Sequence, residues 1–227
     1  MTLLAMLDLS AAFDTVNHQI LLRKLTANGI GGSAINWFKC YLAERSQSVV
    51  VNGALSKMVP LETGVPQGSV LGPLLFALYV NDVTTVIRRF DGVEHLMYAD
   101  DLQVFIRAHP DDAGNALRIL EDCICEVKRW FDEHYLTVNQ TKTEFMVFGT
   151  HHVLKKVPPL TLKFGEATIE PSDCVRNLGV WLDPQLKLNR HVAKVTQLSY
   201  VSLRMNPNAS GLQIVLLPSL SSGSVTY

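Results

Sequence analysis

Two adjacent carboxylates, Asp100 and Asp101, are the residues of this sequence best suited to chemistry. They stand between short apolar runs, residues 95–99 and 102–106, which are rich in β-forming residues and indicate the arms of a hairpin. Like charges crowded at one turn cost free energy unless a cation or solvent compensates them. A divalent metal site would use both carboxylates, whereas an ordinary surface turn, where aspartate is common, would use neither.

A third carboxylate, Asp8, follows another apolar run at residues 3–7, which predicts a buried strand. If the two strands are neighbours in one sheet, Asp8, Asp100 and Asp101 converge. Three carboxylates could hold two Mg²⁺ ions about 3.5–4 Å apart, the arrangement used for in-line phosphoryl transfer. Mg²⁺ suits such a site because it takes hard oxygen ligands and keeps water and phosphate oxygens in its shell. Mn²⁺ is the alternative ion.

Length and composition predict a protein with a sizeable core. The 227 residues are enough for one large domain, or for one domain and part of a second, and 48% of them are hydrophobic. The net charge of −1 gives no compositional support for a nucleic-acid partner, although acidic residues confined to a metal site could mask a basic surface. The four cysteines lack zinc-ligand spacing, which favours reduced, intracellular thiols. No apolar stretch is long enough for a transmembrane helix, so no membrane partner is expected.

The order of predicted elements indicates an α+β domain with an antiparallel sheet rather than a doubly wound fold, because strands and helices do not alternate regularly. Asn17 is expected to cap a helix, and Asn52-Gly53 to join two strands of a hairpin. The expected helices are residues 17–27, 33–42, 71–87, a long amphipathic helix that begins at Asp111 or Asp112, and residues 191–204; the expected strands are residues 3–7, 48–52, 58–62, the arms around Asp100, and residues 145–148.

Charge and proline content divide the chain into three parts. Lys155-Lys156 and Pro158-Pro159 favour a boundary near residues 153–159. The predicted divisions are therefore residues 1–152, residues 153–215 and a serine-rich, irregular tail at residues 216–227.

Five segments, taken in order, resemble the reverse transcriptase domain of a LINE-type (non-LTR) retrotransposon. They are residues 7–14, 64–73, 98–101, 136–143 and 177–183. The resemblance implies a polymerase palm with an antiparallel sheet and flanking helices in residues 1–152, followed by the palm–thumb connection and a partial thumb. It implies an RNA-directed DNA polymerase that adds deoxynucleoside triphosphates to a DNA primer 3′-hydroxyl on an RNA template.

The resemblance also assigns roles to the acidic residues and to one lysine. Asp8 and Asp100 would be the main metal ligands and Asp101 the third carboxylate. Lys142 would face the triphosphate and protonate the pyrophosphate leaving group. Without the resemblance, Lys142 is equally well explained as a surface lysine.

The same resemblance assigns the nucleotide contacts. Phe13 matches the aromatic steric gate that clashes with a 2′-hydroxyl, which argues against an RNA-templated RNA polymerase. Gln67 would lie along the incoming nucleotide, and Gly68 would let the backbone approach it closely. The alternative readings are a core aromatic at Phe13 and a simple turn at Pro66-Gln67-Gly68.

The sequence departs from the family pattern at its beginning. The family has a long fingers region before its first palm motif, whereas Asp8 lies seven residues after Met1. The chain is therefore expected to lack fingers and endonuclease portions of a larger polyprotein and to have little activity alone. The alternative function is a catalytically silent palm that acts as a nucleic-acid or protein interaction module. The sequence leaves the compartment open between nucleus and cytoplasm.

Overall fold

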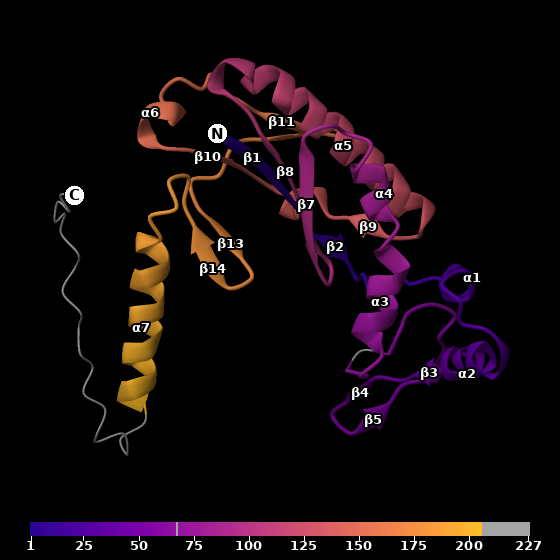
Figure 1. Cartoon of the computed structure of the whole chain (residues 1–227). Coiled ribbons are helices and arrows are strands. Elements are labelled where there is room, and N and C mark those ends of the chain that lie inside the picture. The colour runs from indigo at the N-terminus through magenta and orange to yellow at the C-terminus, as the bar shows by residue number, and fades with distance from the viewer. Residues whose placement is uncertain (67, 206–227) are drawn as a thin grey trace, which may run out of the picture.

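A four-stranded antiparallel sheet forms the centre of the computed structural model, which describes residues 1–66 and 68–205. The strand order is β10–β1–β8–β7, so the first strand of the chain lies between two strands that come much later (Figure 1). The bounds are Thr2–Leu7 for β1, Val93–Tyr98 for β7, Asp101–Arg107 for β8 and Glu144–Phe148 for β10. The predicted α+β class with an antiparallel sheet is confirmed.

The long helix α5, Ala113–Glu133, covers one face of this sheet (Figure 1). Alternate residues of β1 and β8 point toward it because side chains in a strand alternate between faces. Leu3, Ala5 and Leu7 are paired with Ile106, Val104 and Leu102, and all six belong to the buried core. Each large apolar side chain buried there stabilises the fold by roughly 1.5–3 kcal/mol. The opposite face is mixed: Leu4 and Met146 are buried there, and Gln103 is a buried polar residue of the same face.

Two helices near the N-terminus pack against each other, and the first of them packs against α3, Gly72–Val80. Helix α1, His18–Ala27, is capped by Asn17, whose side chain accepts a hydrogen bond from the Ile20 amide at 3.0 Å. Helix α2 spans Gly32–Leu42. Both predicted helices, and the predicted cap at Asn17, are confirmed.

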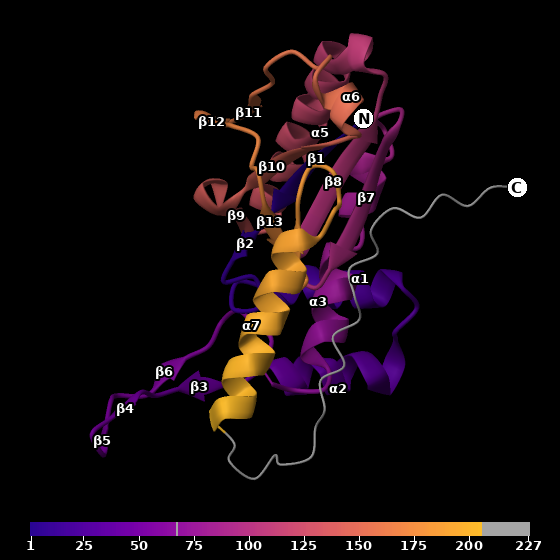
Figure 2. The same ribbon diagram turned by 90° about the vertical axis from the view of Figure 1, so that its left-hand side faces the viewer.

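The predicted hairpin at Asn52-Gly53 is present, but its strands are shorter than expected. Both turn residues have positive φ, 49° and 82°, as a tight primed turn requires. The predicted pairing was wrong: the turn joins Val50–Val51 to Ala54–Leu55, and the part of 58–62 that is a strand, Val59–Pro60, pairs with Ser46–Gln47 instead. Four two-residue strands take their place: Ser46–Gln47 (β3), Val50–Val51 (β4), Ala54–Leu55 (β5) and Val59–Pro60 (β6). The β4–β5 end projects away from the rest of the chain (Figure 2).

The single helix predicted for residues 71–87 was wrong. Two helices occupy this region, α3 at Gly72–Val80 and α4 at Val83–Ile87, and the break falls at Asn81 and Asp82. Both residues are weak helix formers. The Asp82 carboxylate forms an ion pair with Lys24 of α1 at 2.8 Å, an interaction with a neighbouring helix that accompanies the break.

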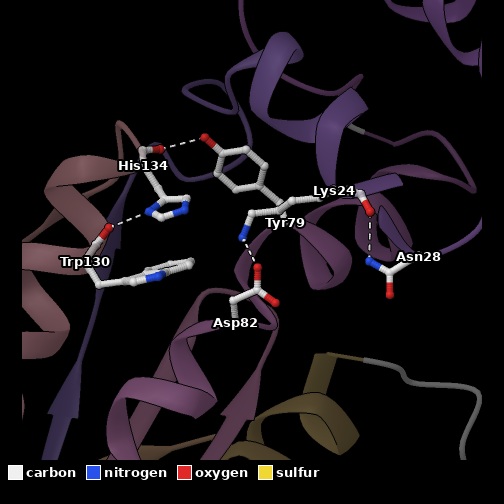
Figure 3. A network of polar contacts seen from close by, with 6 residues as sticks. All are labelled: Lys24, Asn28, Tyr79, Asp82, Trp130 and His134. Carbon is white, nitrogen blue, oxygen red and sulfur yellow. Dashed lines mark hydrogen bonds and ion pairs between the residues drawn. The ribbon is translucent and has the colours of Figure 1, made fainter. Parts of the chain in front are cut away.

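A junction network joins α1, α3, α4 and the end of α5 (Figure 3). We use this name for Lys24, Tyr79, Asp82, Trp130 and His134. The Lys24 ammonium lies 4.7 Å from the Trp130 ring centroid, and the His134 ring stacks on Trp130 at 3.8 Å. The Tyr79 hydroxyl donates to the His134 carbonyl at 2.6 Å and accepts from the Asn17 amide at 3.3 Å. Each charge and buried hydroxyl of the network therefore has a partner.

The C-terminal part of the described chain consists of short elements followed by one long helix. Asp183 links the two, because its carboxylate accepts hydrogen bonds from the amides of Gln185, Lys187 and Leu188 at 2.8–3.1 Å. The remaining elements are β2 (Leu9–Ser10), η1 (Pro110–Asp112), β9 (Thr137–Val138), η2 (Gln140–Lys142), α6 (His151–Leu154), β11 (Leu162–Phe164), β12 (Ala167–Ile169), β13 (Val175–Asn177), β14 (Val180–Leu182) and α7 (Asn189–Met205).

The predicted helix at residues 191–204 is thus confirmed as α7. The predicted tail at residues 216–227 lies outside the described residues, as do residues 206–215. Within the part of the chain that the structure describes, no helix has the combined length and apolarity needed to cross a membrane.

Candidate active site

Asp8 and Asp101 end up side by side because their strands are neighbours. The β1–β8 pairing ends at Leu7 with Leu102, so Asp8 and Asp101 are the next residues of the two adjacent segments. Leu7 and Leu102 face α5, so alternation puts both carboxylates on the other face of the sheet. There they line a cavity of about 180 Å³ together with Lys142. We call this the carboxylate cavity.

Asp100 occupies the turn of the β7–β8 hairpin and lines a different hollow. Tyr98 pairs with Asp101, so the turn consists of Ala99 and Asp100 alone. Ala99 has a φ of 53°, a position where a tight hairpin turn favours glycine. Asp100 lines a second cavity, of about 480 Å³, with Phe13 and Gly68. The Asp100–Asp101 pair therefore sits between the two cavities.

The three carboxylates affect one another electrostatically. The pKa of Asp101 is raised, first by burial and then by the negative charges of Asp100 and Asp8. One Asp8 oxygen, Oδ2, is buried and has no hydrogen-bond partner, although the Lys142 ammonium lies 3.3 Å from it as an ion pair. The Lys142 side chain is itself 65% exposed, so solvent weakens that pair. The cavity is lined by three acidic residues, Asp8, Asp101 and Glu144, and by two basic ones, Lys142 and Arg176, so its acids outnumber its bases by one.

The donor chemistry of these residues fits a divalent cation, but their side chains do not form a closed set of ligands. Carboxylate oxygens are the hard ligands that Mg²⁺ prefers, and Asp8 Oδ2 has no hydrogen-bond partner that would compete with a cation, apart from its ion pair with Lys142. Among the described residues, however, no group of three or more His, Cys, Asp or Glu is close enough to hold a metal ion. The structure brings Asp8 and Asp101 to one cavity and leaves Asp100 on the other.

Phe13 and Gly68 lie together in the second cavity, as part of a contact between two loops. The Phe13 ring stacks on Phe76 with 4.7 Å between ring centroids, and the Phe13 carbonyl accepts from the Val65 amide at 2.8 Å. Gly64 permits this approach: its φ is 91°, and a Cβ there would lie 2.9 Å from the Asp14 carbonyl oxygen. Gln67, the third predicted nucleotide contact, lies outside the described residues.

Sequence reasoning missed three residues that line the carboxylate cavity: Gln103, Glu144 and Arg176. Gln103 is a polar residue within the apolar strand segment 102–106, and Glu144 directly precedes the apolar strand segment 145–148. Both positions are therefore visible in the sequence as polar residues next to apolar ones. Glu144 pairs with Met6 and is partly buried, and its burial raises the pKa of the carboxyl. Arg176 is far away in sequence, and only the fold brings it to the cavity.

Comparisons with known proteins identify the family. A family model described as "Reverse transcriptase (RNA-dependent DNA polymerase)" matches residues 1–182. The "Probable RNA-directed DNA polymerase from transposon X-element" of Drosophila melanogaster is 30% identical over 191 residues, which are 83% of this chain and 20% of that protein. The "RNA-directed DNA polymerase from mobile element jockey" of the same organism is 29% identical, over 85% of this chain and 21% of that protein. The chain thus spans about a fifth of the length of these relatives.

Solved structures support the same fold. Apo telomerase from Candida tropicalis superposes with a TM-score of 0.55 at 13% sequence identity, over 83% of this chain and 31% of that chain. A form of that telomerase truncated from its C-terminal domain gives 0.53 at 16% identity. Identity this low shows the fold alone, which is the predicted polymerase palm. On the family match and the sequence relatives, this chain belongs to the reverse transcriptase (RNA-dependent DNA polymerase) family, as a domain of the LINE-type, non-LTR retrotransposon kind.

Proposed function

We propose that this chain carries the catalytic carboxylates of an RNA-directed DNA polymerase and transfers deoxynucleotides to a DNA primer on an RNA template. The observation that supports this most strongly is that Asp8 and Asp101 line one cavity, where Asp8 Oδ2 is buried and has no hydrogen-bond partner beyond its ion pair with the exposed Lys142. That concentration of uncompensated negative charge suits a bound cation better than it suits a stable empty core.

Asp8, Asp100 and Asp101 are the residues that would hold two Mg²⁺ ions, or Mn²⁺ in their place. When bound, such ions stabilise the charge on a reacting phosphate and ease ionisation of the attacking hydroxyl. The primer 3′-oxygen forms a bond to the α-phosphorus of the nucleotide, and the bond from that phosphorus to the bridging oxygen of pyrophosphate breaks. Lys142, already beside Asp8, is positioned to give its proton to the departing pyrophosphate.

The second cavity would take the incoming nucleotide. Phe13 and Gly68 line it with Asp100, so a sugar placed there lies between an aromatic ring and the carboxylates. The Phe13 ring is braced by Phe76 and cannot easily turn away from a 2′-hydroxyl. Gln67 would complete the nucleotide contacts, and the remaining parts of a longer polyprotein would supply the rest of the template and triphosphate contacts.

Magnesium titration by calorimetry tests the site, and primer extension on an RNA template tests the reaction. We expect Asp8→Asn and Asp101→Asn to weaken Mg²⁺ binding at least about tenfold, because each removes a charged ligand. Asp91→Asn, at an exposed turn, serves as the matched control. Unchanged Mg²⁺ affinity in both variants would remove the site assignment.

In the extension assay, Asp100→Ala is expected to abolish incorporation, and Phe13→Ala to admit ribonucleotides. Incorporation that survives Asp100→Ala would contradict the proposal. Salt-dependent binding of a duplex with no incorporation and no Mg²⁺ requirement would instead favour the silent interaction module.

A further inference from the structure

Helix α2 carries a tryptophan that the hydrophobic core does not use. Among the residues of α2, Leu42 is the buried one. Phe38 and Tyr41 pack against the core, whereas Trp37 lies outside the core cluster of the described residues and is 53% exposed. The helix forms an outer corner of the molecule beside α1 (Figure 1). Core packing therefore does not explain an indole at this position.

The exposed ring is nevertheless held in one orientation. Trp37 stacks on Tyr41, with 5.3 Å between ring centroids and 15° between ring planes, and it meets the Phe38 ring edge-on at 5.1 Å. The Arg45 guanidinium lies 4.7 Å from the Tyr41 ring centroid, and its Nε donates to the Tyr41 carbonyl at 2.6 Å. We call Trp37, Tyr41 and Arg45 the aromatic column. A ring that is already fixed loses little freedom when a second flat ring stacks on its open surface.

The charge around the aromatic column is positive, in contrast to that of the chain as a whole. Residues 31–61 contain the bases Lys39, Arg45 and Lys57 and a single acid, Glu44, in a chain whose net charge is −1. Over residues 1–66 and 68–205, no carboxylate lies within ion-pair distance of Arg45. Exposed rings beside unpaired cations are the combination that binds single-stranded nucleic acid, whose bases stack and whose phosphates are neutralised. An apolar protein partner would leave these cations without a counterpart.

Arg45 connects the aromatic column to the second cavity. It lines a further cavity, of about 590 Å³, with Gln47 and Pro66. Pro66 also lines the second cavity, where Phe13 and Asp100 lie. The two cavities thus share Pro66 as a wall, so a strand that extends past Pro66 from the second cavity reaches the Arg45 guanidinium.

We propose that Trp37 and Arg45 form a binding site for an unpaired stretch of nucleic acid. One base stacks on the open surface of the indole, and a neighbouring phosphate pairs with the Arg45 guanidinium. The ligand is a single strand, because a base inside a duplex has both faces covered by its neighbours. The site needs no metal, primer or nucleoside triphosphate, so it goes beyond the proposed polymerase function and does not depend on it.

Binding of single-stranded RNA, measured by fluorescence anisotropy without divalent cations, tests the stacking. The probe is a labelled RNA strand of about ten nucleotides, compared with an abasic strand of the same length and with a blunt duplex. We expect the parent chain to bind the complete strand about tenfold more tightly than the abasic one. Trp37→Leu should remove that difference, and Trp37→Phe should keep part of it. Tyr135→Leu, which removes a 63% exposed ring outside the site, is the matched control.

The salt dependence of binding tests the phosphate contact. Arg45→Leu should reduce the slope of log affinity against log salt concentration by about 0.7, the value for one phosphate contact on a single strand. Arg45→Lys keeps the charge and should keep the slope. Quenching of tryptophan fluorescence by the complete strand is a second readout, which the conservative variant Trp37→Phe should reduce.

Equal affinity of the parent chain for the complete and abasic strands, or a difference that survives Trp37→Leu, would overturn the stacking site. An unchanged salt slope in Arg45→Leu would overturn the phosphate contact. Self-association that Trp37→Leu abolishes, with RNA binding unchanged, would assign the ring to a protein contact instead. Base-dependent binding in a chain that fails to extend a primer would count against the polymerase function and leave this site supported.

Discussion

The junction network and the carboxylate cavity both gather ionisable side chains from distant parts of the chain, but they balance charge in opposite ways. In the junction network, Lys24 has a carboxylate and two aromatic rings around it, and its side chain is only 11% exposed. In the carboxylate cavity, burial and the neighbouring charges of Asp100 and Asp8 raise the pKa of Asp101, and a buried Asp8 oxygen has no hydrogen-bond partner.

That difference is the one expected between a structural cluster and a ligand-binding one. A set of charges whose partners all come from the protein is complete, and changing it costs stability. A set with charge left over is unfavourable for the folded chain alone and is kept where a ligand compensates it. Neutralising a charge should therefore destabilise the first region and stabilise the second.

The largest effect is expected at Tyr79, whose hydroxyl bonds to both the His134 carbonyl and the Asn17 amide. Tyr79→Phe leaves both backbone groups without that partner and should cost about 2 kcal/mol of unfolding free energy, measured by urea denaturation. Tyr135→Phe is the matched control because Tyr135 is 63% exposed. Equal losses of unfolding free energy in Tyr79→Phe and Tyr135→Phe would show that the hydrogen bonds of the Tyr79 hydroxyl do not stabilise the fold.

A smaller loss is expected from Lys24→Met, which keeps most of the aliphatic stem and removes the charge. The ammonium contacts Trp130 and Tyr79, and its ion pair with Asp82 is partly exposed to solvent, so the combined cost should be about 1 kcal/mol. Lys39→Met, on the exposed side of α2, is the control. If Lys24→Met raised the unfolding free energy, removal of a charge would stabilise both regions, which contradicts the contrast between them.

The pH dependence of stability probes the same network through His134. Burial lowers the pKa of His134, and the nearby Lys24 charge adds to this. The unfolded chain therefore binds more protons between the lowered value and about 6.5, so stability rises with pH across that window and is lost on acidification. One proton can change the unfolding free energy by at most roughly 1.4 kcal/mol per pH unit. His134→Asn keeps a donor for the Trp130 carbonyl but cannot bind this proton, so we expect the dependence of stability on pH to become less steep by a fraction of that value.

Thermal unfolding between pH 5 and 7 measures this slope. The pKa of His95 is also lowered by burial, so part of the slope should remain in the variant. His152→Asn, at an exposed position of α6, should leave the slope unchanged. A slope that His134→Asn does not alter would show that protonation of the network is not coupled to folding.

The smallest effect, and the one of opposite sign, is expected in the carboxylate cavity. The raised pKa of Asp101 means that the folded chain holds this proton more tightly, so stability falls as pH rises through the window above the unfolded value. Asp101→Asn removes the repulsion and should stabilise the chain at pH 7, in the absence of divalent cations, by roughly a few tenths of a kcal/mol. A loss of stability in this variant would break the contrast between the two regions.

Added Mg²⁺ provides a second measurement. A cation that binds only the folded state stabilises it, so Mg²⁺ should raise the unfolding temperature of the parent chain. The increase in unfolding temperature should be smaller for Asp101→Asn. Asp91→Asn should respond as the parent does.

Local patterns in the sequence were sufficient for much of the fold. The apolar run at residues 3–7, the cap at Asn17, the stripe along α5 and the Asn52-Gly53 turn are signals carried by neighbouring residues, and the structure contains all four. The break in residues 71–87 was not predicted, because the Lys24–Asp82 ion pair joins residues 58 positions apart. Local helix propensity contains no information about such a partner.

The sequence by itself determined which residues could do chemistry: the Asp100–Asp101 pair at a turn, Asp8 after a strand, and the ordered segments that mark the reverse transcriptase family. Only the tertiary structure decided how they meet. The fold brings Asp8 and Asp101 to one cavity, leaves Asp100 in a second cavity with Phe13, and brings Gln103 within hydrogen-bond distance of Asn177. Register and chain crossing are collective properties of the packed sheet, so no single stretch of sequence specifies them.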